Sequence, residues 1–113
     1  MTFDEYQIEA WKTALYPEKG TGSLLALAYC ALGLGEQGEI QGKIKKFIRG
    51  DYGPDLTGEV RSSILAELGD LLWYVNAAVK ELKASLDDVA QGNINKLRDR
   101  QKRGVIRGDG DNR

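Results

Sequence analysis

The residues I-L-A-E-L-G-D-L-L-W-Y-V at 64–75 are the most informative about the fold, because they are apolar enough to be buried yet include two acids. The apolar residues of this stretch recur at the three- and four-residue spacing of a helix. Glu67 and Asp70 are three residues apart, so they share one helical face with Cβ atoms about 5–6 Å apart. Ionised carboxylates on a face built for burial cost on the order of several kcal/mol unless a positive group pairs with them. The stretch therefore predicts a long helix whose buried face needs a cation.

A second acidic pair lies in the preceding apolar segment, residues 31–48, where Glu36 and Glu39 repeat the three-residue spacing. Two such helices packed face to face would bring four carboxylates together. Hard divalent cations such as Mg²⁺ prefer oxygen ligands of this kind. We therefore expect a metal-dependent enzyme whose metal ligands and catalytic groups are the same four residues, Glu36, Glu39, Glu67 and Asp70.

Helix-start signals divide the chain into four expected helices. The residues that can cap their backbone N–H groups are Thr2 (with Glu5), Ser23, Asp55 or Thr57, and Ser85 (with Asp88). The expected helices span residues 3–15, 24–49, 58–83 and 86–102. No segment shows a strong strand pattern. The sequence therefore predicts an all-α fold, with the second and third helices antiparallel across a short loop.

Glycines interrupt the second expected helix at positions 33, 35, 38 and 42. Each costs roughly 0.5–1 kcal/mol relative to Ala in a helix interior. Their number predicts a bend, or the close approach of another element or ligand to the backbone. Residues 104–113 are rich in Gly and Asp and show no period. We expect one domain over residues 1–103, followed by a tail over residues 104–113.

The composition excludes several kinds of chemistry. A chain of 113 residues has room for one hydrophobic core. It contains no histidine, which rules out an imidazole base, a Ser-His or Cys-His nucleophile pair and a His-ligated zinc or iron site. The single cysteine, Cys30, lies in the apolar run of residues 24–32, so we expect a buried structural thiol.

Charge and hydropathy limit the partners. A net charge of −1 does not favour non-specific electrostatic binding to nucleic acid or to an anionic membrane. Residues 96–113 hold seven Lys or Arg and three Asp, a local excess that could contact nucleic acid, but the Gly-Asp interruptions favour the phosphate of a small ligand. The first residues do not resemble a signal peptide. The longest uncharged apolar stretch, 24–35, falls short of the ~20 residues that span a bilayer. We expect a cytoplasmic protein without a membrane partner.

One face of each of the last three helices carries groups that suit a magnesium-bound nucleotide. Carboxylates suit the cation, ammonium groups suit phosphate, and an aromatic ring can stack on a base. Walking each helix at spacings of three and four from the acidic pairs, and along the last helix, gives the candidate substrate-binding residues Lys43, Lys46, Tyr74, Asn93 and Lys96.

Several of these residues also have a simpler interpretation. Lys43 and Lys46 are ordinary helical partners of Glu39, worth a few tenths of a kcal/mol. Tyr74 on an apolar helix is typical of a core residue. The acids of residues 67–70 could be neutralised by ion pairs alone. The functional interpretation depends on the acidic pairs and the lysines occurring together.

The chain resembles the MazG-like family of all-α nucleoside triphosphate pyrophosphohydrolases over nearly its whole length. The strings that match the two acidic motifs are A-L-G-L-G-E-Q-G-E-I at 31–40 with K-I-K-K at 43–46, and A-E-L-G-D-L-L-W-Y at 66–74. Those similar to the family's opening and closing helices are F-D-E-Y-Q at 3–7, T-A-L-Y-P at 13–17 and D-V-A-Q-G-N-I-N-K-L-R-D-R at 88–100.

The resemblance implies a four-helix, MazG-like bundle completed by formation of a homodimer or homotetramer. It implies hydrolysis of (deoxy)nucleoside triphosphates between the α- and β-phosphates, giving the monophosphate and pyrophosphate. Carried over by motif, the four acids would bind Mg²⁺, for which Mn²⁺ can substitute. Asn93 and Lys96 would contact phosphate or sugar, and Tyr74 would help to wall the base pocket.

Two other classes of protein remain as alternatives. A ferritin-like di-metal protein also places Glu on bundle helices, but that class uses Glu-x-x-His and this chain has no histidine. A non-catalytic helical module, oligomeric and binding a nucleotide or a protein partner, would keep the acidic cluster for folding or recognition. Titration of Mg²⁺ and nucleotides would separate such a module from the enzyme.

Overall fold

The computed structural model describes residues 1–51 and 58–113, apart from the side chains of Glu36 and Gln37. Its elements are α1 (Phe3–Trp11), α2 (Leu24–Gly33), the 3-10 helix η1 (Leu34–Glu36), α3 (Gln37–Ile48), α4 (Gly58–Glu81) and α5 (Leu86–Lys102). These residues contain no strand, which confirms the all-α prediction. Since α2, η1 and α3 together form the second expected helix, the four expected helical segments are all present.

Side-chain caps begin three of these segments as the sequence predicts. The Thr2 hydroxyl accepts a hydrogen bond from the Glu5 backbone N–H at 3.1 Å, and the Glu5 carboxylate accepts one from the Thr2 N–H at 2.7 Å. The hydroxyls of Ser23 and Ser85 accept backbone N–H bonds from the residue three positions on, at 3.1 and 3.4 Å. Each bond satisfies a donor that the first helical turn leaves without a partner. The expected cap at Asp55 or Thr57 lies outside the described residues.

Two helices end earlier than predicted. The first was expected to reach residue 15, but α1 ends at Trp11, and the following turn sends Ala14 and Tyr16 into the core, where they are 1% and 6% exposed. The third was expected to reach residue 83, but α4 ends at Glu81, because Lys83 has a φ of +58° that a right-handed helix does not allow. The last helix has the predicted bounds.

The predicted interruption of the second helix lies at η1, beside Gly33. A Cβ atom on Gly33 would lie 2.1 Å from two ring carbons of Tyr74 on α4. No real Cβ tolerates such a distance, so the glycine allows the Tyr74 ring to contact the α2 backbone. By contrast, added Cβ atoms at residues 35, 38 and 42 would meet nothing within 4 Å among the described residues. The glycine cluster thus reflects one close approach and one short change of helix type.

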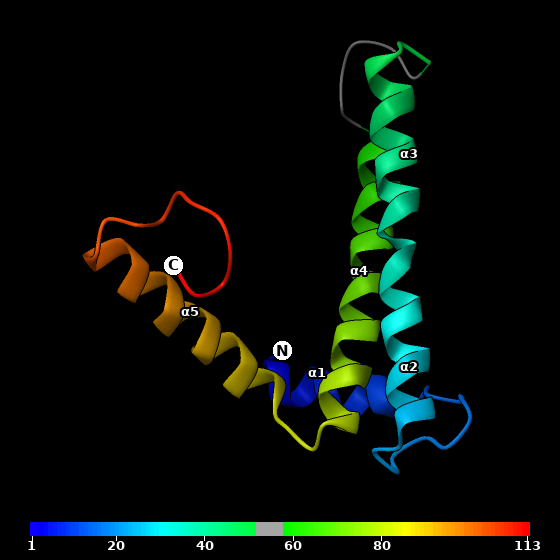
Figure 1. Cartoon of the computed structure of the whole chain (residues 1–113). Coiled ribbons are helices and arrows are strands. Elements are labelled where there is room, and N and C mark those ends of the chain that lie inside the picture. The colour runs from blue at the N-terminus through cyan, green and yellow to red at the C-terminus, as the bar shows by residue number, and fades with distance from the viewer. Residues whose placement is uncertain (52–57) are drawn as a thin grey trace.

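The helices form an open arrangement (Figure 1). The continuous α2–η1–α3 segment runs antiparallel beside α4, while α1 crosses the base of this pair and α5 leads away from it. The radius of gyration is 17.1 Å. A compact domain of this length would have a value of about 13 Å. One chain therefore leaves much of its helix surface uncovered.

Among the described residues, the buried core lies at the base, where α1, α2 and the end of α4 meet. Its buried members are Ala14, Tyr16, Ala26, Cys30 and Ala77, with Trp11 and Trp73 packed against them. Cys30 is fully buried, as predicted, and burial raises the pKa of its thiol. No described side chain of α3, and none of α4 before Asn76, is buried. The half of the α3–α4 pair that carries the acidic motifs thus lacks a core of its own.

A buried carboxylate holds the loop between α1 and α2. Glu81, at the end of α4 and 3% exposed, accepts hydrogen bonds from the Tyr16 hydroxyl at 2.9 Å and from the backbone N–H groups of Gly20 and Gly22 at 2.5 and 3.1 Å. Burial alone would raise the pKa of Glu81, but these bonds and the nearby Lys83 ammonium outweigh it and lower the pKa. Burial and the contact with Glu81 raise the pKa of Tyr16. This contact fixes the base of the molecule.

Candidate active site

The structure brings one predicted ligand and one predicted phosphate-binding residue together. The Lys43 Nζ on α3 lies 3.7 Å from the Glu67 Oε1 on α4, and the two side chains are only 27% and 18% exposed. Beside them is a pocket of about 250 Å³ lined by Lys43, Glu59, Val60 and Ser63. Because the pair is beyond hydrogen-bond distance, the Glu67 oxygens keep the capacity to accept other donors or a cation.

Asp70 lies on α4 one helical turn after Glu67, close enough to α1 to influence Tyr6. It is exposed, and its negative charge adds to burial in raising the pKa of Tyr6 on α1. Tyr6 was not among the residues selected from the sequence, although it lies in the string F-D-E-Y-Q that resembles the family's opening. Since nothing in the spacing of that string predicts contact with α4, only the tertiary structure could reveal it.

The acidic pair on the other helix is less fully described. Glu39 and Lys46 lie on α3 with exposed side chains, and the side chain of Glu36 is outside the described part of the structure. Among the described residues, no group of three or more His, Cys, Asp or Glu side chains is arranged to hold a metal ion. The convergence of all four carboxylates thus stays a prediction.

The chemistry of the available donors suits a hard cation. Glu39, Glu67 and Asp70 offer only carboxylate oxygens, the ligands that Mg²⁺ prefers. The chain has no histidine, and its one thiol, Cys30, is buried in the base and so cannot compete as a soft ligand. Residues on α3 and α4 therefore fit magnesium better than zinc or iron.

Tyr74 lies where α2 packs on α4. Its ring contacts the backbone at Gly33 and meets the Trp73 ring edge-on, with centroids 5.1 Å apart and planes at 84°. These contacts favour the simpler interpretation, in which Tyr74 is a packing residue. Its expected role in walling a base pocket is not tested by them and stays a prediction.

Asn93 and Lys96 lie on α5 and are exposed. Because α5 leads away from the α3–α4 pair, one chain does not bring them beside Glu67 or Lys43 (Figure 1). The Lys96 ammonium instead contacts the tail, donating to Asp111 Oδ1 at 2.9 Å. Within one chain, the predicted site is therefore divided between the α3–α4 pair and α5.

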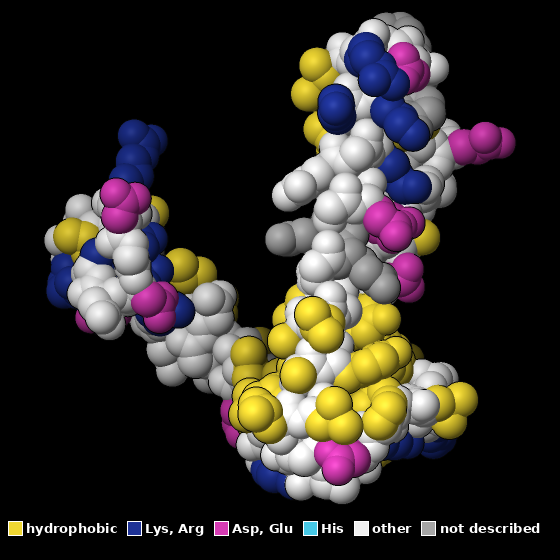
Figure 2. Space-filling model, turned by 45° about the vertical axis from the view of Figure 1, so that its right-hand side comes forward, with side chains coloured by type: hydrophobic (Ala, Val, Ile, Leu, Met, Phe, Trp, Pro, Cys, Tyr) yellow, Lys and Arg dark blue, Asp and Glu magenta, His cyan; other side chains and the backbone are white. Residues whose placement is uncertain are grey.

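The surface reflects the same division (Figure 2). Lys and Arg side chains gather at the far end of the α3–α4 pair, acidic side chains lie below them, and apolar side chains gather over the base. A second group of basic side chains lies on the separate arm that α5 forms with the tail. In the part of the chain that the structure describes, none of the helices combines the length and the hydropathy of a membrane span.

Fold and site together define an all-α protein with acids and lysines on two antiparallel helices and further cations on a third. The family model for the MazG nucleotide pyrophosphohydrolase domain matches residues 26–105, and the chain belongs to this family. The match begins in α2 and includes both acidic pairs, Asn93 and Lys96.

One curated protein with high similarity comes from a bacteriophage. The chain is 48% identical to the Gene 37 protein of Mycobacterium phage L5 over 115 residues, which cover 100% of both chains. No solved structure matches the chain.

Proposed function

We propose that this protein is a nucleoside triphosphate pyrophosphohydrolase that cleaves between the α- and β-phosphates to give a nucleoside monophosphate and pyrophosphate. The observation that carries the proposal is the family match over residues 26–105, which spans every acid and lysine chosen independently from the helical spacing. The Lys43–Glu67 contact supports it, because it joins an acidic motif and a lysine across α3 and α4.

In this proposal the four acids, Glu36, Glu39, Glu67 and Asp70, would hold Mg²⁺, with Mn²⁺ as a substitute. A divalent ion bound there would supply Lewis-acid activation and neutralise phosphate charge. Lys43 and Lys46 on α3, with Asn93 and Lys96 on α5, would bind and orient the phosphates. Transfer of a phosphoryl group needs mainly such positioning and charge stabilisation, so the absence of histidine is no obstacle.

The proposed enzyme is a homodimer or homotetramer. Its support is the large apolar side chains that are exposed on the α3–α4 pair, which lacks a core there: Ile48 (80%), Leu65 (49%) and Leu68 (47%). Burial of apolar surface contributes a favourable free energy of about 25 cal/mol per Å². A second copy packed on the α3–α4 pair would bury these side chains and could add the α5 cations that one chain keeps apart from its acids.

Product analysis tests the proposed reaction. Canonical and modified nucleoside triphosphates are incubated with the protein in Mg²⁺, and monophosphate, pyrophosphate and inorganic phosphate are measured separately. We expect equal amounts of monophosphate and pyrophosphate, loss of activity in EDTA, and recovery with Mg²⁺ or Mn²⁺. Release of inorganic phosphate with the diphosphate, or activity that persists in EDTA, contradicts the proposal.

A second candidate function is a non-catalytic, oligomeric nucleotide-binding module. The observation that favours it is that no three described acids are arranged to hold a metal ion. Calorimetry of Mg²⁺ and nucleotides separates the two candidates, because a module would bind the nucleotide and return it unchanged.

A further inference from the structure

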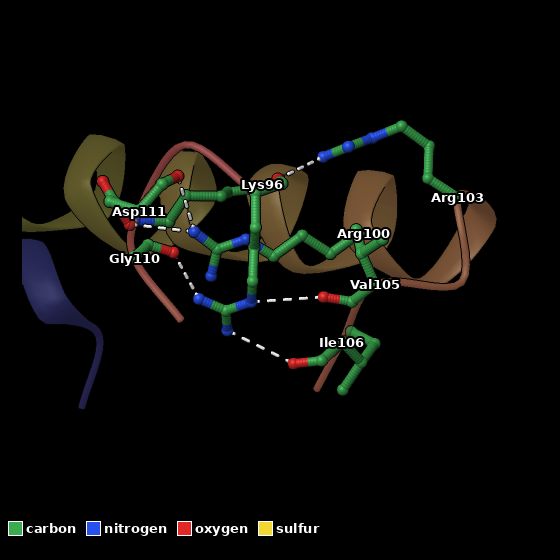
Figure 3. A network of polar contacts seen from close by, with 8 residues as sticks. Lys96, Arg100, Arg103, Val105, Ile106, Gly110 and Asp111 are labelled. Atoms are coloured by element: carbon green, nitrogen blue, oxygen red, sulfur yellow. Dashed lines mark hydrogen bonds and ion pairs between the residues drawn. The ribbon is translucent and has the colours of Figure 1, made fainter. Parts of the chain in front are cut away.

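The tail places a carboxylate between two cations of α5 (Figure 3). Asp111 Oδ1 accepts hydrogen bonds from the Lys96 Nζ and from the Arg100 Nη2, each at 2.9 Å. Arg100 also donates to the Asp111 backbone carbonyl at 2.8 Å. Lys96 and Arg100 are four residues apart, so both side chains rise from one face of the helix. They form a pair of cations with one shared anion.

The two sides of this contact differ in burial. The Arg100 side chain is only 7% exposed, whereas the Asp111 side chain is 76% exposed. Among the described residues, Arg100 has no ion pair with any other carboxylate. A buried guanidinium that loses its anion is costly, so this position requires an anion but does not require Asp111 in particular.

The rest of the tail is folded so as to present Asp111. The Arg113 guanidinium donates to the backbone carbonyls of Val105 and Ile106, both at 3.2 Å, and to that of Gly110. Arg103, the residue after the end of α5, donates to the Arg113 main-chain oxygen at 2.7 Å. Hydrogen bonds from arginine side chains to main-chain oxygens thus hold the tail as a closed loop. Of the tail side chains, Asp111 is the one that contacts Lys96 among the described residues.

We propose that Lys96 and Arg100 form a binding site for a phosphate group, and that Asp111 occupies this site in the free protein and competes with the ligand. The inference rests on the proposed function, since it assigns Lys96 and Arg100 to the phosphates of the same substrate. Guanidinium and ammonium groups bind carboxylate and phosphate oxygens through the same charge-assisted hydrogen bonds. A polyphosphate carries more charge than one carboxylate, so it can displace Asp111 and leave Arg100 paired.

Asp111 stays an anion under ordinary conditions. Hydrogen bonds from Lys96 and Arg100 hold its pKa below the usual range. The competition is therefore between two anions at neutral pH and does not depend on protonation of the tail.

Binding of inorganic tripolyphosphate in EDTA tests the proposal without metal or turnover. Asp111→Asn keeps the shape of the side chain but removes its charge, so we expect roughly tenfold tighter binding by calorimetry, within the usual range of coupling between competing ligands. Asp109→Asn is the matched control, because Asp109 lies in the same loop and makes no ion pair among the described residues; its affinity should equal that of the wild type. Unchanged or weaker binding by Asp111→Asn overturns the competition.

A second set of variants tests the two cations. Asp111→Asn is combined with Lys96→Gln, and separately with Arg100→Gln. Lys96 is exposed, so its variant should fold, and the Arg100 variant is checked for native helicity. In both backgrounds, Asp111→Asn should no longer tighten tripolyphosphate binding. A gain that persists in both backgrounds would show that the phosphate binds elsewhere.

These experiments separate the site from the reaction. A wild-type protein that releases no pyrophosphate but shows the expected Asp111→Asn gain would overturn the proposed function and keep the anion site. Pyrophosphate release by the wild type, with no tighter tripolyphosphate binding by Asp111→Asn, would overturn the anion site and keep the proposed function.

Discussion

Among the individual residues, Glu67 is the acid whose burial and contacts best support a catalytic role. It is largely covered, it belongs to the acidic motif on α4, and its Oε1 lies 3.7 Å from the Nζ of Lys43 on α3. As an ion pair between partly exposed groups, this contact is worth about 0–1 kcal/mol. Its contribution to stability is therefore small, and its loss can be separated from loss of activity.

We predict that Glu67→Gln lowers pyrophosphate release by roughly 100-fold or more, because the charge that would hold the cation is lost. Helicity by circular dichroism should be unchanged. Glu9→Gln is the control, since Glu9 is an exposed acid on α1 paired only with Lys12 among the described residues. Wild-type turnover in Glu67→Gln removes this residue from the mechanism.

Gly33 gives a second prediction, on stability. Gly33→Ala forces a methyl group to within 2.1 Å of the Tyr74 ring carbons, so α2 and α4 must separate or the ring must move. We expect destabilisation of about 1–3 kcal/mol, measured by urea unfolding. Gly35→Ala is the matched control, because its Cβ would meet nothing within 4 Å; it should be neutral or slightly stabilising. Equal effects in the two variants would contradict the close packing.

At the scale of elements, Glu81 joins the end of α4 to the loop that leads into α2. Its two carboxylate oxygens accept three hydrogen bonds, from Tyr16, Gly20 and Gly22. Neither loop nor helix alone explains the position of this acid, because an exposed glutamate near a helix end is common in any sequence. The contact makes the base of the molecule sensitive to acid.

We predict that stability falls as the pH is lowered, and that Glu81 contributes to the fall. Its pKa in the folded protein lies below the ordinary 4.5, so its contribution is present above that value and is lost as the pH falls through the folded-state pKa. Glu81→Gln should be less stable than the wild type at pH 7, by about 1–3 kcal/mol. The difference should shrink in urea-unfolding curves as the pH falls below the ordinary 4.5. A constant difference would show that the charge of Glu81 is unimportant.

At the scale of the whole molecule, the main feature is the contrast between a closed base and an open α3–α4 pair. Small residues such as Ala26, Cys30 and Ala77 let the helices approach closely at the base. Further along, leucines and isoleucines remain exposed on both helices. The proposed association would cover these side chains and so add stability.

We predict that the protein is oligomeric at micromolar concentrations, measured by light scattering after size exclusion. Leu68→Lys together with Ile48→Lys should shift it toward monomer, because two charges would enter the covered face. Leu82→Lys is the control: Leu82 is 64% exposed, but lies beyond the end of α4 at the base. A wild-type monomer at these concentrations contradicts the proposed association.

Local sequence patterns were enough to predict the four helical segments and most of their starts. Capping side chains and helical periodicity are local properties, so Thr2, Ser23 and Ser85 located helix starts correctly and the last helix was predicted at both ends. The acidic motifs were also local, and the family match includes them. The burial of Cys30 followed from its apolar neighbours.

Tertiary structure alone decided how these elements meet. That Tyr74 packs on Gly33, that Glu81 holds a loop some 60 residues away, and that Asp111 lies on Lys96 and Arg100 are contacts between distant parts of the chain. Such contacts depend on the direction in which each helix leaves its turn, and residue spacing within one helix carries no information about that direction. For the same reason, the early end of α1 at Trp11 and the departure of α5 from the pair were not predictable from pattern.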